Sequence, residues 1–297
     1  MSARFISLLA RFLSIFPLSV NRTLGSFIGR ITWLKNGRTR RVTETNLRLC
    51  FPHLNKLDRE KLTRENLQET GKQLTECAWL WHRPKQQVLN HIEEWICKDL
   101  LASAVASNRG VIVVSPHIGN WEVCAAAVST LTPFTYLYRI PRNVGLDLLL
   151  KRWRANLDGM PATLDNTGIR ASLRILKNGG TIGILPDQEP DLDSGQFSPF
   201  FGEPALTMTL LSKLARRSNA IVLLCVCKRL QKTNGWQVQF LEADPDTGNA
   251  DLHKAVLAVN RDVERCISLC PEQYLWSYKR FNTLKNGSRR DYLSLQP

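Results

Sequence analysis

The sequence predicts an α/β protein in which a mainly parallel or mixed sheet is flanked by helices. The chain has 297 residues, of which 43% are hydrophobic, so it is long enough to bury one substantial core. From Gly110 onward, short apolar runs rich in β-branched residues alternate with longer segments that have helical periodicity. This alternation is typical of strands and helices that succeed each other in a layered α/β domain.

The N-terminal segment, residues 1–41, is predicted to be a helical membrane anchor. It is basic and amphipathic, with eight Lys and Arg residues and no acidic residue. From Arg4 to Phe16 the chain is apolar except for two arginines and two serines at helical spacing. At about 1.5 Å per residue this stretch is too short for a bilayer core of roughly 30 Å, so we expect an interfacial helix. A secretory signal peptide and an ordinary amphipathic core helix are the other interpretations.

The remaining residues, 42–297, are predicted to form one domain. Its parts are a helical lead-in at 42–106, a catalytic α/β core at 107–281 and a basic tail at 282–297. Mixed-charge stretches at 57–81 and 87–102 predict the helices of the lead-in. The predicted strands of the core are 111–114, 135–138, 181–185, 220–227 and 236–241, and its predicted helices are 121–130, 145–158, 168–177, 205–217 and 251–268.

The formal net charge of +14 is concentrated at the two ends of the chain. Positive ends suit an anionic membrane surface, an acidic carrier protein or nucleic acid. Because the sequence contains no recognised nucleic-acid-binding module, we expect no nucleic-acid partner. The eight cysteines form no Cys-x-x-Cys pair and, with five scattered histidines, no zinc ligand set, which favours reduced thiols and a cytosol-facing protein.

A histidine and a glutamate follow the first strand of the predicted core. The strand Val111–Val114 is ended by a proline, which lacks the N–H that a sheet requires, so His117 falls in a strand-to-helix turn. Asn120 suits the N-cap of the next helix, and Glu122 then lies in its first turn, where the helix dipole favours a carboxylate. An imidazole held by this carboxylate could take a proton from a substrate hydroxyl. The plain structural alternative is a helix cap beside a solvated acid.

Polar residues also follow two other predicted strands. Arg139 ends the strand 135–138, and Asp187 and Gln188 follow the strand 181–185. Because ligands gather at the carboxyl ends of parallel strands, we expect these residues to lie near His117. Arg139 would bind a phosphate or, alternatively, form a surface salt bridge. Asp187 and Gln188 would position an acceptor or else order the loop of the pocket.

Three blocks of the sequence together resemble one protein family. The run His117-Ile-Gly-Asn-Trp-Glu122 is similar to the His-x4-Glu block of the bacterial lipid A late acyltransferases, a branch of the lysophospholipid acyltransferase superfamily. Tyr138-Arg139 followed by Asn143 is similar to the second block of that family, and Gly183-Ile-Leu-Pro-Asp187-Gln188 to the third. The blocks stand in the expected order, and the resemblance extends over residues 38–281.

This resemblance implies a glycerol-phosphate-acyltransferase-like fold and transfer of a fatty acyl chain from acyl carrier protein to a hydroxyl of a lipid A precursor. The reaction would take place at an anionic membrane surface, the cytoplasmic face of the bacterial inner membrane, without metal or cofactor. His117 and Glu122 would be catalytic, and the substrate-binding residues would be Asn120, Arg139, Asn143, Asp187 and Gln188. The nearest alternative is an acyltransferase for another glycolipid or aminolipid, with carrier-protein or coenzyme A donors. A membrane-surface binding protein without turnover is an alternative of another class.

Overall fold

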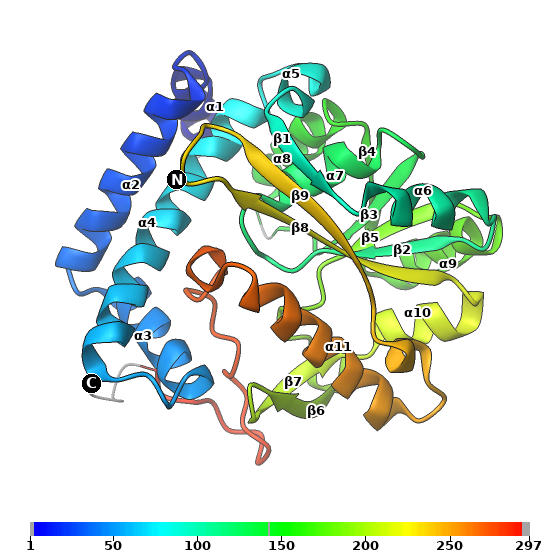
Figure 1. Ribbon diagram of the computed structural model, residues 1–297. Helices are drawn as coiled ribbons and strands as arrows, with labels where there is room; N and C mark the ends of the chain where they lie inside the picture. The colour runs from blue at the N-terminus through cyan, green and yellow to red at the C-terminus, as the bar shows by residue number, and fades with distance from the viewer. Residues whose placement is uncertain (1–2, 142, 293–297) are drawn as a thin grey trace.

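The computed structural model describes residues 3–141 and 143–292 and contains the predicted α/β sheet (Figure 1). Seven strands follow the order β1-β9-β8-β2-β5-β3-β4. Their bounds are β1 Ile92–Ile96, β2 Val111–Val114, β3 Phe134–Tyr138, β4 Gly159–Thr163, β5 Thr181–Ile184, β8 Ile221–Arg229 and β9 Trp236–Glu242. Strands β8, β2, β5, β3 and β4 run parallel, whereas β9 is antiparallel to β8 and parallel to β1. The expectation of a mainly parallel or mixed sheet is therefore confirmed.

The five predicted strands are present, but the sequence analysis missed the two edge strands and a hairpin. The prediction of a helix at 87–102 is wrong, because β1 occupies the middle of this segment between two short helices. Strand β4 contains Pro161, which an edge strand tolerates since one side of it needs no partner. The predicted helix 205–217 begins instead at Leu210, because the hairpin of β6 Gly195–Phe200 and β7 Glu203–Met208 precedes it.

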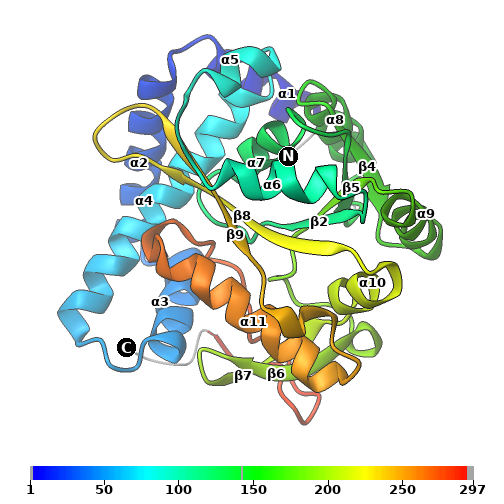
Figure 2. The same cartoon turned by 45° about the vertical axis from the view of Figure 1, so that its right-hand side comes forward.

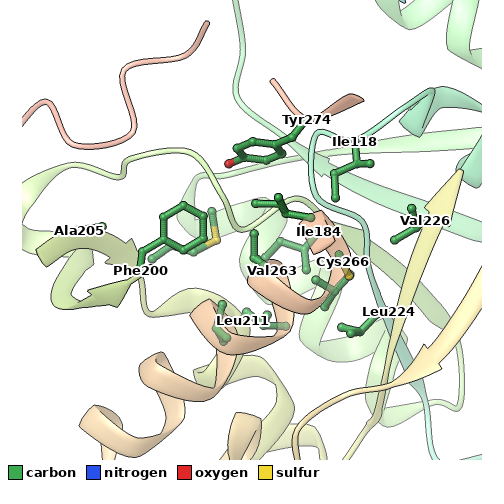
Figure 3. Close-up of a cluster of buried hydrophobic side chains, with 14 of the residues drawn as sticks. Ile118, Ile184, Phe200, Ala205, Leu211, Leu224, Val226, Val263, Cys266 and Tyr274 are labelled. Atoms are coloured by element: carbon green, nitrogen blue, oxygen red, sulfur yellow. The ribbon is translucent and has the colours of Figure 1, made fainter. Parts of the chain in front are cut away.

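Helices cover both faces of the sheet. Their bounds are α1 Ala3–Ser14, α2 Leu18–Leu34, α3 Arg38–Cys50, α4 Lys56–Leu80, α5 Lys85–Leu89, α6 Lys98–Ala106, α7 Trp121–Val128, α8 Val144–Ala155, α9 Asn166–Lys177, α10 Leu210–Ser218 and α11 Leu252–Ser268. Ile112 and Val114 of β2 belong to a core with residues of α10 and α11, whereas Val111 and Val113 belong to a core with α6 and α7. Figure 3 shows the first of these cores, in which Ile184 of β5, Leu211 of α10 and Val263 of α11 belong to one cluster.

The two N-terminal helices pack on α4 at the side of the molecule away from α9 and α10 (Figures 1 and 2). Glycines allow α2 to approach α4 closely, since a Cβ at Gly25 would lie 2.5 Å from the backbone oxygen of Gly71. Among the described residues, no helix is both long and apolar enough to cross a membrane. Residues 1–2 of the predicted N-terminal segment and 293–297 of the predicted basic tail lie outside the described residues.

Candidate active site

Strand register brings His117 and Asp187 together. Val114 pairs with Ile184 at the ends of the neighbouring parallel strands β2 and β5, and each functional residue follows three positions later. The Nδ1 atom of His117 lies 2.8 Å from Oδ1 of Asp187, and the backbone N–H of His117 donates to Oδ2 at 2.9 Å. The expectation that these strand ends converge is thus confirmed for this pair.

The backbone of the turn after His117 is held from two sides. The N–H of Gly119 donates to the oxygen of Gln273 at 2.9 Å, and the N–H of Asn120 donates to the oxygen of Cys227 at 2.9 Å. Gly119 has a φ of +56°, and a Cβ there would collide with the Cys227 carbonyl, so only glycine suits this position. These contacts fix the position from which the imidazole projects; below, residues 117–120 are called the catalytic turn.

Asp187 is the carboxylate that orients the imidazole. Its side chain is 2% exposed. Burial alone would raise the pKa of Asp187, but the charge of His117 and the hydrogen bonds from its ring and backbone hold this pKa below its ordinary value. An ionised Asp187 accepts a hydrogen bond from Nδ1–H of the imidazole. In the neutral ring Nε2 then carries no proton and keeps its lone pair. Gln188 lies 3.2 Å from Nε2, where its amide can donate.

The prediction that Glu122 holds the imidazole is wrong. Glu122 does lie in the first turn of α7, as predicted, but its carboxylate accepts three hydrogen bonds from Arg154 of α8, at 2.5 to 3.1 Å. This carboxylate is directed toward α8, and Asp187 occupies the Nδ1 side of His117 instead. Burial disfavours the Arg154 charge, yet Glu122 raises the pKa of Arg154 above its ordinary value, so the guanidinium stays ionised.

Replacing Arg154 with methionine is expected to destabilise the protein. The side chain of Glu122 is 5% exposed and would become an unpaired buried charge, whereas that of Arg154 is 22% exposed. The expected loss in the free energy of unfolding is about 3 kcal/mol, measured by urea denaturation. The double variant Glu122→Gln/Arg154→Met should recover part of this loss, because no charge is then left alone. A single variant as stable as the wild type would contradict this role of the pair.

Three residues expected to bind substrate make other contacts. Asn120 is fully buried and donates to Oε2 of Glu76 at 2.9 Å, so its side chain supports the turn and does not line the cavity beside His117. It stands at the N-cap of α7 but makes no side-chain capping bond. Asn143 is exposed and caps α8 by accepting from the N–H of Leu146 at 3.1 Å. Arg139 forms the surface ion pair given as its alternative, with an exposed Asp191 at 2.8 Å.

A cavity of about 770 Å³ lies beside His117. Its wall is mostly apolar and comes from the ends of β2, β3 and β5 and from helices α7 to α10. The predicted residues His117, Glu122, Arg139 and Gln188 line it, while Asp187 lies behind the imidazole. Sequence reasoning missed three lining cations, Arg154, Lys213 and Arg217, which belong to no recognised motif. The helical pattern of α10, with its basic residues beside apolar ones, is the signal that could have indicated Lys213 and Arg217.

These groups can carry out proton transfer at the edge of an apolar chamber. The imidazole Nε2 is the candidate base, Asp187 stabilises the imidazolium, and the apolar wall suits a long hydrocarbon chain. A hydroxyl that approaches Nε2 would replace the amide of Gln188. The site thus fits attack by an alcohol on an acyl group.

Comparisons with known proteins agree with this chemistry. The family model described as "Bacterial lipid A biosynthesis acyltransferase" matches residues 4–283. The chain is 28% identical to a lipid A biosynthesis lauroyltransferase of Escherichia coli K12, over 91% of this chain and 88% of that protein. It is 29% identical to a palmitoleoyltransferase of the same pathway and organism, over 93% and 90%, and 25% identical to a myristoyltransferase, over 91% and 82%.

Proposed function

This chain belongs to the bacterial lipid A biosynthesis acyltransferases and is a late acyltransferase of lipid A synthesis, and on this premise we propose the following reaction. A fatty acyl chain passes from the thioester of acyl carrier protein to a hydroxyl of a lipid A precursor. The observation that carries this proposal is the His117–Asp187 pair at the edge of a large apolar cavity.

His117 acts as the general base. Its Nε2 takes the proton of the acceptor hydroxyl while the hydroxyl oxygen attacks the thioester carbonyl. The C–S bond then breaks, the acyl group stays on the acceptor oxygen, and the imidazolium returns its proton to the departing thiolate. Asp187 stabilises the imidazolium between these steps, as a buried carboxylate on Nδ1 does in hydrolase triads. Transfer is direct, and no acyl-enzyme forms.

The other cavity residues position the substrates. The amide of Gln188 donates to Nε2 of His117 before the substrate binds, and it turns toward the acceptor once the hydroxyl takes its place. Glu122 fixes Arg154, and this pair shapes the wall that receives the acyl chain. Arg139 binds a phosphate of the glycolipid by exchanging its exposed partner Asp191, a step that costs little because surface ion pairs are weak.

A cationic face on α9 and α10 supports acyl carrier protein as the donor. Arg170 and Arg174 lie one turn apart on α9 and are exposed, and Lys213 and Arg217 of α10 are exposed and also line the cavity. Helices α9 and α10 contact each other, and both contribute residues to the wall of the cavity. An acidic carrier protein would be attracted to this face and could deliver its thioester toward His117.

The double variant Arg170→Glu/Arg174→Glu is expected to lower kcat/KM with acyl carrier protein by about tenfold or more at low salt, because electrostatic attraction mainly accelerates association. The control variant Lys61→Glu/Arg64→Glu changes the same number of exposed charges on α4, at the other side of the molecule. Initial rates at two salt concentrations provide the measurement. Equal losses in both variants would contradict a docking role for α9.

Association with the cytoplasmic face of the inner membrane is part of the proposal. Helix α1 and the residue that follows it expose large apolar side chains, namely Phe5, Leu8, Phe12 and Ile15, among others. Cationic residues Arg4 and Arg11 flank these side chains. An amphipathic helix of this kind lies in the interface of an anionic bilayer, which would place the cavity near its lipid substrate.

The function is tested by incubating the protein with acyl carrier protein that carries a radiolabelled acyl chain, with and without a tetra-acyl lipid A precursor. We expect label in the lipid when the acceptor is present, and no label on the enzyme when it is absent. Stable label on the enzyme would contradict direct transfer. Label that reaches the acceptor only from acyl coenzyme A would contradict the proposed donor.

A further inference from the structure

A second cavity, of about 470 Å³, lies between α2 and the turn that joins β8 to β9. Figure 2 shows that turn reaching toward α2. One stripe of α2 lines the cavity with Ser19, Arg22, Thr23, Ser26 and Arg30, and the opposite wall contains Lys72, Arg229 and residues 230, 231, 233 and 234. Neither the proposed reaction nor the sequence motifs involve this cavity.

The cavity has an excess of positive charge. Four cationic side chains line it, whereas the carboxylates that neutralise them, Glu69 and Glu76, are two in number. Within the described part of the chain, Arg30 makes no ion pair, and Lys72 makes one, with Glu69 at 2.6 Å. The hydroxyls of α2 add further donors. Cations with hydroxyls in one hollow are suited to a phosphate group.

Exposed apolar side chains of α2 form a rim beside the same cavity. Phe27 lines the cavity and is 58% exposed, and Leu24 and Val20, which lie one and two turns earlier on α2 and outside the lining, are 38% and 46% exposed. A phosphate ester without a hydrocarbon part would not need such a rim. An anionic phospholipid would place its headgroup among the cations and its glycerol and acyl chains against these side chains.

A chain of buried ionic contacts joins this cavity to the catalytic turn. Arg22 donates to Oε1 of Glu76 at 2.5 Å, and Oε2 of Glu76 accepts from Arg229 at 2.8 Å and from Asn120 at 2.9 Å. Arg229 also donates to the oxygen of Gly119 at 3.0 Å. Two cations of the cavity therefore reach the residues that follow His117 through one shared carboxylate.

We propose that this cavity is a phosphate site for an anionic phospholipid headgroup, and that its occupation is transmitted through Glu76 and Arg229 to the catalytic turn. An anion beside Arg22 and Arg229 competes with Glu76 for the same guanidinium groups. The contacts of Asn120 and Gly119 change as a result, and with them the setting of His117. The headgroup thus regulates the enzyme according to the membrane on which it lies.

Binding is measured by calorimetry on the full chain with dihexanoyl phosphatidylglycerol below its micelle concentration. Dihexanoyl phosphatidylcholine serves as the zwitterionic probe and glycerol 3-phosphate as the free phosphate ester. We expect saturable binding of phosphatidylglycerol, and an increase in Kd of about tenfold in Arg30→Gln because a charge-assisted contact is lost. Arg38→Gln removes an exposed arginine of α3 outside the cavity and should leave Kd unchanged.

Three outcomes would overturn the site as a lipid site. Equal affinity for phosphatidylcholine would remove the role of charge, and equal weakening by Arg38→Gln would remove the role of this cavity. Equal affinity for glycerol 3-phosphate would assign the cavity to a free phosphate ester. Absence of saturable binding to any of the probes would overturn the phosphate site itself.

Regulation is measured as the ratio of transfer rates with and without dihexanoyl phosphatidylglycerol, and this part rests on the proposed function. We expect the wild-type ratio to differ from one and the Arg30→Gln ratio to return to one. A wild-type ratio of one would overturn the coupling through Glu76. If the wild type transfers no acyl chain but still binds phosphatidylglycerol, the proposed function fails and the headgroup site stands.

Discussion

Replacing His117 with alanine is expected to lower kcat/KM for acyl transfer by about 10³-fold. The imidazole Nε2 is the base that the geometry provides at the edge of the cavity, and removal of a positioned general base typically costs 10²- to 10⁴-fold. Most of the loss should fall on kcat, because the apolar wall that binds the acyl chain is untouched. Initial rates with saturating acyl carrier protein provide the measurement.

His253→Ala is the matched control for this substitution. His253 is exposed on α11, contacts Gln196 and does not line the cavity beside His117. Its replacement should change the rate little. A folded His117→Ala protein with a rate near that of the wild type would show that His117 is not the general base.

The second large effect is expected from Asp187→Asn. An asparagine has nearly the same shape but cannot stabilise an imidazolium, so kcat should fall by about 10²- to 10⁴-fold. The substitution should also alter the pH dependence of stability. Because the folded protein holds the pKa of Asp187 below its ordinary value of 3.8, the ionised carboxylate stabilises the fold above pH 3.8. This contribution is lost as the pH falls below 3.8 through the lowered pKa.

The free energy of unfolding, measured from neutral pH down to about pH 3 for both proteins, checks this sign. The advantage of the wild type should shrink as the pH falls below 3.8 and Asp187 becomes protonated. Asp193→Asn, which alters an exposed residue of the same loop, should show no such pattern. An advantage that grows toward acid pH would contradict the assignment of Asp187 as the ionised partner.

The sequence was sufficient to predict the strands that carry the site. The β-branched run 111–114 and the proline after it predict the position of His117 correctly, because both signals are local. The proximity of Asp187 to His117 followed from a general rule for parallel sheets. Their direct contact depends on the pairing of Val114 with Ile184, a register that the separate strands do not specify.

The partners of the charged residues could not be predicted in the same way. A spacing of five residues places Glu122 on the first helical turn after His117. The direction of its carboxylate depends on Arg154 of α8, the helix that connects β3 to β4, and β3 is two strands away from β2 in the sheet. Likewise Asn120 has the sequence of an N-cap, yet Glu76 of α4 takes its amide. Edge strands were missed because β1 and β4 bury little of their length and lack regular alternation.

The central claim is that His117 catalyses transfer of an acyl chain to a lipid hydroxyl, and mass spectrometry of the lipid tests it most directly. A tetra-acyl lipid A precursor is incubated with acyl carrier protein loaded with a fatty acyl chain, in parallel reactions with the wild type and with His117→Ala. The account predicts that the wild type adds one acyl chain to the precursor and that the variant, over the same time, leaves nearly all of the precursor unchanged. As much acylated product from the variant as from the wild type, or an unchanged precursor with the folded wild type, would contradict it.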